Sequence, residues 1–206
     1  MPSLVGSEMC IRDRVIALSG PRACGKSTIA THLVNNHGYT RIAFADVLRD
    51  IAAIADPDLT HDRLYLACLG EKLREHVPDF LLQVVKNRLE TINGQVVIED
   101  IRFPAEIEFC QSIGAITIRF EISREEQLRR LEFRDGMVGA EVESMIECVD
   151  EQALASSIIW DYIIPATGDF SELAAAIHTG APSSGIVGAN HKSSSEYTTP
   201  LGSSSE

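Results

Sequence analysis

The stretch VIALSGPRACGKSTIATHL, residues 15–33, decides the fold. Residues 20–27 within it match the pattern G-x-x-x-x-G-K-[ST] at every fixed position. A short apolar run precedes the first glycine, and helical spacing of Ile29, Leu33 and Val34 follows the last, so the segment predicts a strand, a glycine loop and a helix. Such a loop holds phosphates with its backbone N–H groups and the positive end of the helix. The residues expected to bind nucleotide phosphates are Gly20, Pro21, Arg22, Ala23, Cys24, Gly25, Lys26, Ser27 and Thr28.

The chemistry of this loop predicts a bound Mg²⁺–ATP. The Lys26 ammonium is expected to reach the β- and γ-phosphates, and the Ser27 hydroxyl is expected to ligate Mg²⁺. The alternative is a glycine-rich turn that binds nothing.

Composition limits the classes of function. The chain has 206 residues and a net charge of −12, from 30 acidic and 18 basic residues. A broad nucleic-acid surface is basic, so we expect no nucleic-acid partner. No apolar run is long enough to span a bilayer, which predicts no membrane segment. The five cysteines form no C-x-x-C pair, which favours a reducing cytoplasm, and the sequence leaves monomer and homodimer open.

Residues 1–13 and 180–206 differ from residues 14–179 in composition and in hydrophobic periodicity. Residues 1–13 lack the pattern of a signal peptide, and EMCIRDR (8–14) resembles a translated sequencing adapter, so we expect a non-native or disordered leader. Residues 180–206 are rich in serine and glycine and are expected to be disordered. Residues 14–179 are expected to form a single domain.

Strands and helices alternate along this domain. We expect strands at 15–19, 40–45, 95–100, 115–122 and 160–165, and helices at 27–36, 46–55, 60–90 (broken at Val77-Pro78), 104–112, from 123 onward and at 170–178. The expected helix caps are Thr60, Ser123 and Ser171, and residues 135–150 allow no assignment. This alternation predicts an α/β fold with a parallel sheet covered on both faces.

The segment VVIEDIRF (96–103) ends a predicted strand in two acids. A carboxylate at this place, downstream of a phosphate loop, is suited to organising Mg²⁺. Asp100 is the first choice and Glu99 the competitor, since alternation along a strand should point their side chains to opposite faces. The alternative is a solvent-exposed strand end.

Arginines are concentrated in one predicted helix and its approaches. Guanidinium groups suit phosphoryl transfer because they bind two oxygens at once and keep their charge. Interleaved glutamates favour the alternative of a solvated helix face with ion pairs. We expect at least one of these arginines to enter the site: Arg119, Arg124, Arg129, Arg130 and Arg134.

A second phosphorylated substrate would need cations opposite the phosphate loop. Asp46 follows a predicted strand directly, Arg74 lies in the middle helical region, and Arg102 comes two residues after Asp100. These are the available candidates, although each could instead be a surface charge or half of a structural ion pair.

At this point the chain resembles a family. The segments FADVLRDIA, LGEKLREHVPDFLLQVV, VVIEDIRFPAEIEF and DYIIPATGDFSEL follow the loop in this order. They resemble the phage-type deoxynucleoside monophosphate kinases and the related phosphomevalonate kinases, over residues 14–178. The resemblance implies a three-layer α/β sandwich around a five-stranded parallel sheet of order 2-3-1-4-5. It also implies acceptor-side helices at 60–90 and a lid at 123–140.

The most specific part of the resemblance is the run DIRFPAE (100–106), which is similar to the family's D-x-R-F-P-N-E. It implies that Arg102 grips the acceptor phosphate, that Asp100 lies by the metal and the acceptor oxygen, and that Glu106 orients Arg102 or the acceptor. Arg74 matches an acceptor-phosphate arginine. Phe44-Ala45-Asp46 is similar to the start of the family's substrate region, where Arg49 replaces the lysine of a P-L-K sequence.

The last strand, residues 161–168, is similar to the family's D-x-x-I-x-N-x-G, whose loop lies against adenine. Ala105 and Ala166 stand where the family has asparagines.

Together these features predict transfer of the γ-phosphoryl group of Mg²⁺–ATP to a (deoxy)nucleoside 5′-monophosphate. The alternatives are a kinase for another small phosphate ester, such as phosphomevalonate, and a nucleotide-dependent switch without an acceptor. Arg74 and Arg102 count against the switch, because a switch binds no second phosphate. The expected catalytic residues are Lys26, Asp100, Arg129, Arg130 and Arg134; the expected acceptor residues are Asp46, Arg49, Arg74, Arg102 and Glu106; and the expected metal ligands are Ser27 and Asp100.

Overall fold

A computed structural model describes residues 15–135, 159–180 and 187–188. Five parallel strands form the sheet: β1 (Val15–Ser19), β2 (Thr40–Ala43), β3 (Val96–Ile101), β4 (Ile116–Glu121) and β5 (Tyr162–Pro165). Their spatial order is 2-3-1-4-5, as expected, and the short strand β6 (Val187–Gly188) pairs antiparallel with β5. β6 lies inside the tail that was expected to be disordered.

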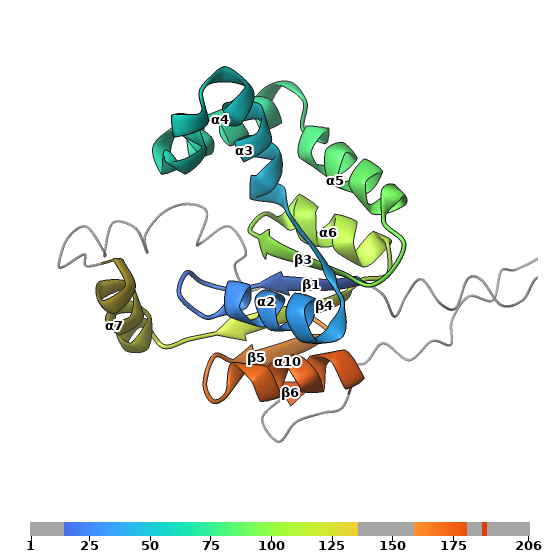
Figure 1. Ribbon diagram of the computed structural model, residues 1–206, viewed down its shortest axis with the longest axis vertical. Coiled ribbons are helices and arrows are strands. Elements are labelled where there is room, and N and C mark those ends of the chain that lie inside the picture. The colour runs from blue at the N-terminus through green and yellow to red at the C-terminus, as the bar shows by residue number, and fades with distance from the viewer. Residues whose placement is uncertain (1–14, 136–158, 181–186, 189–206) are drawn as a thin grey trace, which may run out of the picture.

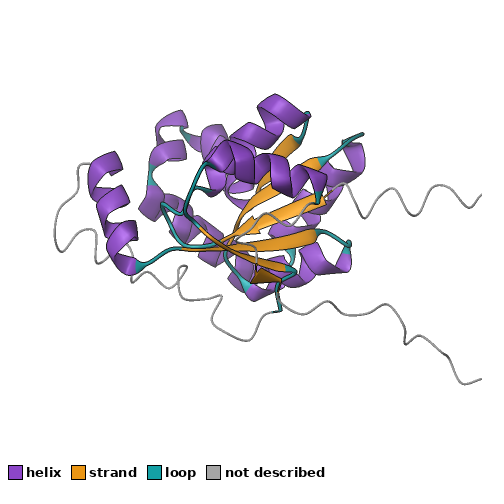
Figure 2. Ribbon diagram, turned by 90° about the horizontal axis from the view of Figure 1, so that it is seen from below, coloured by secondary structure: helices purple, strands orange, loops and turns teal. Residues whose placement is uncertain are grey.

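Helices cover both faces of the sheet (Figures 1 and 2), which confirms the three-layer architecture. α2 (Lys26–His37) and α10 (Phe170–Thr179) pack on one face. The opposite face carries α3 (Phe44–Ala55), α4 (Arg63–His76), α5 (Phe80–Thr91) and α6 (Pro104–Ser112), with the 3₁₀ helix η1 (Pro57–His61) between α3 and α4. α7 (Arg124–Asp135) follows β4.

The central strand β1 shows why the sheet needs both layers. All five of its residues are buried, because it pairs with β3 on one side and β4 on the other. Successive side chains point to opposite faces, so Val15 and Ala17 join one core while Ile16 and Leu18 join the other. The two cores hold the carboxyl ends of the strands, and the loops that follow them, in fixed positions.

Two of the expected helix caps are wrong. Asp62, not Thr60, caps α4 by accepting the backbone N–H of Tyr65 at 3.0 Å, while Thr60 lies inside η1. Asp169, not Ser171, caps α10 by accepting the N–H of Ser171 at 2.7 Å. In both places a carboxylate stands nearer the helix start and takes the free N–H groups. The expected contact at 123 is present, because Glu126 N–H donates to Ser123 Oγ at 3.2 Å.

Three further expectations concern membrane segments, the cysteines and the lid. No helix in the described ranges is long and apolar enough to cross a membrane. Cys24 and Cys110 are buried free thiols and Cys68 is an exposed one. Residues 136–150, which include the end of the expected lid, lie outside the described residues.

Candidate active site

The glycine loop fits tightly between its neighbours. Gly20 has φ +143°, and a Cβ there would lie 2.7 Å from the carbonyl oxygen of Phe120. Gly25 has φ +96°, and a Cβ there would lie 2.6 Å from the ring of Phe170. Both positions therefore require glycine for conformation and for space.

Lys26 lies in the first turn of α2, and its ammonium is folded back onto the loop. It donates to the carbonyl oxygens of Gly20 at 2.5 Å and Pro21 at 2.8 Å. To contact a phosphate, the ammonium exchanges these carbonyls for phosphate oxygens. Of the expected nucleotide-binding residues, the structure brings six to a cavity: Arg22, Ala23, Gly25, Lys26, Ser27 and Thr28.

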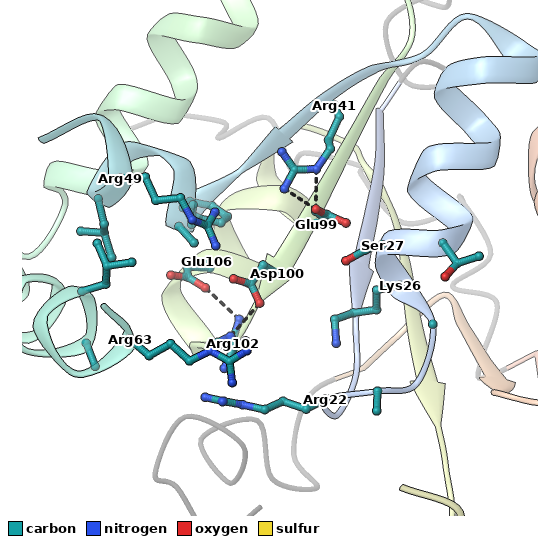
Figure 3. A pocket seen from close by; sticks show the side chains of 18 of the residues that line it. Arg22, Lys26, Ser27, Arg41, Arg49, Arg63, Glu99, Asp100, Arg102 and Glu106 are labelled. Atoms are coloured by element: carbon teal, nitrogen blue, oxygen red, sulfur yellow. Dashed lines mark hydrogen bonds and ion pairs between the residues drawn. The ribbon is translucent and has the colours of Figure 1, made fainter. Parts of the chain in front are cut away.

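That cavity has a volume of about 910 Å³ and extends from the glycine loop to α3, α4 and α6. Figure 3 shows Arg22 extending from the loop toward Arg63 and Arg102 on the opposite wall. Ten of the chain's 18 basic residues line the cavity, although the whole chain carries a charge of −12. A concentration of cations in an acidic chain marks an anion-binding site. The ten are Arg22, Lys26, Arg41, Arg49, Arg63, Arg74, Arg102, Arg129, Arg130 and Arg134.

The end of β3 is irregular where Glu99 and Asp100 lie. Between the pairs Ala17–Ile98 and Ser19–Ile101, β3 contains one residue more than β1, which is a β-bulge. Asp100 adopts a left-handed φ of +67° at this bulge. The bulge interrupts the alternation of side chains, and both acids line the same cavity.

The wall of the cavity across from the glycine loop includes the end of β3 and the start of α6. The buried Glu106 carboxylate accepts the backbone N–H groups of Arg102 at 2.8 Å and Phe103 at 3.2 Å. It therefore positions Arg102 through the backbone. The Arg102 side chain donates from Nε to Asp100 Oδ1 at 2.7 Å, and the Arg74 guanidinium stacks 4.0 Å from the centre of the Phe103 ring.

Burial raises the pKa of Glu106 to about 7, against the opposing effects of the two backbone N–H groups and of Arg74. The carboxylate is almost fully removed from water, and burial disfavours its charged form. Protonation of Glu106 near neutral pH therefore alters the charge beside Arg74 and Arg102.

Asp46 does not line the cavity, in contrast to its expected role at the acceptor. Its carboxylate accepts from Arg41 and Arg49, both at 2.7 Å. Arg41 also binds Glu99 through Nε and Nη2. Asp46 thus holds two arginines that do line the cavity, and its effect on a ligand is indirect.

The helix α7 contacts the glycine loop directly. Gln127 Nε2 donates to the Arg22 carbonyl at 3.1 Å, and Arg130 donates to the carbonyls of Ala23 at 3.2 Å and Ala166 at 2.8 Å. Arg130 also lies 5.7 Å from the centre of the Phe170 ring, the same ring that packs on Gly25. These contacts make Arg130 a support of the loop in this structure.

Only some of the remaining arginines of this region line the cavity. Arg129 and Arg134 line the cavity, and Arg129 pairs with Glu126 at 2.7 Å. Arg119 instead lies 5.9 Å from the centre of the Trp160 ring, and neither it nor Arg124 lines the cavity.

Several cavity residues have no motif that would have identified them from sequence. From the sequence alone, the aromatic and apolar lining residues cannot be distinguished from ordinary core residues. Arg41 and Arg63 cannot be distinguished from isolated surface charges. Only the concentration of basic residues in an acidic chain was a usable signal. The residues in question are Arg41, Arg63, Phe103, Phe133 and Phe170.

The donor atoms of the cavity fit Mg²⁺. The ion prefers hard oxygen ligands and usually keeps several waters beside one or two carboxylates and the phosphates of its substrate. Ser27, Asp100 and Glu99 supply a hydroxyl and two carboxylates to the same cavity. No cluster of three or more His, Cys, Asp or Glu side chains suited to a metal occurs among residues 15–135 and 159–180, so an all-protein metal cage is not present there.

Solved structures share this fold. TT1252 from Thermus thermophilus is 21% identical with a TM-score of 0.56, and the match covers 81% of this chain and 95% of that one. Shikimate kinase from Aquifex aeolicus is 15% identical with a TM-score of 0.50, and the match covers 79% of this chain and 93% of that one. No protein-family model and no curated protein matches the sequence. At these identities the likeness establishes the fold, which is the P-loop kinase arrangement of strands and helices.

Proposed function

We propose that this chain is a phosphotransferase that moves the γ-phosphoryl group of Mg²⁺–ATP to a small phosphorylated acceptor, with a (deoxy)nucleoside 5′-monophosphate as the first candidate. The observation that carries the proposal is a single cavity with two cationic walls. The glycine loop forms one wall, and Arg49, Arg63, Arg74 and Arg102 stand on the other. A protein that only bound or hydrolysed ATP would need the first wall alone.

The chain's own residues would act mainly by position and charge, since phosphoryl transfer needs little covalent help. Lys26 would leave the loop carbonyls and bind the β- and γ-phosphates. Arg102, held by Asp100 and by the Glu106 backbone contacts, would orient the acceptor phosphate in line with the donor. Arg129 and Arg134 would neutralise charge on the transferring group from the α7 side.

Mg²⁺, when bound with ATP, would neutralise negative charge on the phosphates. Ser27 would hold it, together with a carboxylate from the end of β3. Closure of the α7 side over the cavity would exclude water and suppress hydrolysis of ATP.

The nucleotide acceptor rests on the resemblance of the DIRFPAE run to the phage-type deoxynucleoside monophosphate kinases. Membership of that family stays a hypothesis. A phosphate ester without a base, such as phosphomevalonate, would use the same donor wall and the same arginines, and differs only in what fills the apolar part of the cavity at Phe44, Leu48 and Leu66.

The test is ADP release from Mg²⁺–ATP by the full chain against a panel of acceptors. The panel holds the common ribo- and deoxyribonucleoside monophosphates, phosphomevalonate and a control without acceptor. Release that depends on one or a few acceptors supports the proposal and names the acceptor. Release that is the same with every acceptor and without one would show a nucleotide hydrolase or switch instead.

A further inference from the structure

One buried carboxylate oxygen in this structure has no hydrogen-bond partner. Glu99 is only 4% exposed, and its Oε2 contacts no donor within the described part of the chain. Leaving a buried carboxylate oxygen without a partner is costly, so such an atom in a folded protein calls for an explanation.

The surroundings of Glu99 fix where that oxygen points. Arg41 binds Oε1 with both Nε and Nη2, and this ion pair holds the carboxylate in one orientation. The side chain lines the cavity at the bulge of β3. In Figure 3 the carboxylate lies between Arg41 and Ser27, with the second oxygen on the Ser27 side.

Asp100 is placed differently at the same bulge. Its Oδ1 accepts from Arg102 Nε at 2.7 Å, and its side chain is 24% exposed. Asp100 pairs with Arg102, whereas the unpaired oxygen of Glu99 lies on the side of Ser27, at the start of α2.

We propose that Glu99, rather than Asp100, supplies the carboxylate of the magnesium site, and that Asp100 is a positioning residue for Arg102. The Oε2 atom of Glu99 would bind the ion or accept from one of its water ligands, together with the Ser27 hydroxyl. This inference rests on the proposed function, because the ion arrives with the nucleotide. It reverses the order in which the strand pattern ranked the two acids.

The test measures how strongly the metal improves nucleotide binding. The affinity of the full chain for ADP is determined by calorimetry in excess Mn²⁺ and again in EDTA, and the ratio of the two values is the metal effect. Glu99→Gln keeps the size of the side chain and an acceptor for Arg41. We expect it to lower the metal effect at least about tenfold while the affinity in EDTA stays within about twofold, as for loss of a group that supports a metal's ligands.

Asp100→Asn is expected to leave the metal effect within about twofold and to weaken use of the acceptor. Glu75→Gln, an exposed glutamate on α4 paired with Lys72, is the matched control and should change neither quantity. If Glu99→Gln folds poorly by circular dichroism, Glu99→Asp retains the charge but shortens the reach, and should lower the metal effect as well.

Two results would overturn the inference. If Glu99→Gln retains the full metal effect, the residue is only the ion-pair partner of Arg41. If Asp100→Asn loses the effect instead, Asp100 is the metal carboxylate. The wild-type chain could show a metal effect that is lost in Glu99→Gln and still release no ADP in response to any acceptor. That result would support this inference and contradict the proposed function, so the two failures can be told apart.

Discussion

Lys26 is the single residue on which the proposed transfer depends most directly. Its ammonium is held by two loop carbonyls, at 2.5 and 2.8 Å, on the edge of the cavity. These oxygens compete with phosphate for the same three N–H donors. The lysine side chain is thus held against the loop, and it must leave these carbonyls to bind a nucleotide.

Lys26→Ala should lower the rate of acceptor-dependent ADP release at least about 100-fold, because a positioned charge at the transferring group is lost. Lys86→Ala, an exposed lysine on α5, is the matched control and should behave as the wild type. Steady-state kinetics with circular dichroism checks this prediction. Activity close to wild type in Lys26→Ala would contradict the proposed role of the loop.

Arg102→Ala should raise the KM for the acceptor about 10- to 100-fold and leave the affinity for ATP within about threefold, since a charge-assisted contact to phosphate is lost on one wall only. Arg88→Ala, which removes a surface ion pair with Asp50, is the control. An equal loss of ATP binding and acceptor use in Arg102→Ala would place Arg102 outside the acceptor site.

The raised pKa of Glu106 predicts that the stability of the folded chain depends on pH. The pKa of about 7 in the folded chain lies above the usual glutamate pKa of 4.5. The folded state therefore holds this proton more tightly, and the associated stability is complete below about pH 4.5 and is lost as the pH rises through 7. The loss amounts to about 3 kcal/mol.

Glu106→Gln keeps an oxygen that accepts from Arg102 and Phe103 but has no proton to lose. The free energy of unfolding, measured in urea at pH 5 and pH 8, should therefore fall with pH more steeply in the wild type than in Glu106→Gln. Other titrating groups contribute equally to both proteins and cancel in the comparison. An identical pH dependence in the two proteins would mean that Glu106 is not perturbed by burial.

At the scale of whole elements, the bulge of β3 and the helix α7 shape the site. The bulge is fixed in part by Ser19 Oγ, which donates to the Ile101 carbonyl at 2.8 Å from the neighbouring strand. α7 braces the opposite side through Gln127 and Arg130, which together bind the carbonyls of two loop residues. The glycine loop is thus supported by a helix more than 100 residues away in the sequence.

This bracing predicts a difference between two adjacent arginines. Lysine cannot reproduce the forked contacts of Arg130 to Ala23, Ala166 and Glu126. Arg130→Lys should therefore lower the Tm of the nucleotide-free chain by about 2–4 °C, the shift expected for loss of about 1 kcal/mol in a domain of this size. It should also raise the KM for ATP. Arg129→Lys changes a 70% exposed side chain and should leave Tm unchanged.

Thermal unfolding without ligand separates the two roles for Arg130. A residue that acts only in the transition state would lower kcat and leave the Tm of the nucleotide-free chain as in the wild type. That result in Arg130→Lys would restore its expected catalytic role and remove the supporting one.

For the molecule as a whole, charge is distributed unevenly. Ten of the 18 basic residues line one cavity in a chain of net charge −12. The acidic exterior repels anions, while the cavity attracts them, and this contrast favours small anionic substrates over large polyanions.

This distribution predicts a salt effect on substrate binding. Raising KCl from about 0.05 to 0.5 M shortens the Debye length about threefold, from roughly 14 to 4 Å, and should raise the KM for the acceptor several-fold. Kinetics at several salt concentrations, with Tm measured in parallel, would check this. A KM that does not change with salt would argue that the acceptor carries little charge.

The sequence by itself determined the order of strands and helices, the position of the phosphate loop and the presence of acids at the end of β3. These features depend on local patterns: apolar alternation, glycines at fixed spacing and short runs of β-branched residues. The resemblance supplied the strand order 2-3-1-4-5, which the structure confirms. It also named Arg74 and Arg102, both of which line the cavity.

The tertiary structure alone decided which side chains share the cavity and what holds them. The bulge at Glu99 and Asp100 depends on pairing with β1, and the position of Arg41 depends on Glu99, a partner 58 residues away. Asp46 was expected at the acceptor and instead holds Arg41 and Arg49. Such choices are made by contacts between distant segments, and local sequence does not encode them, because a charged residue chooses its partner only when the chain is folded.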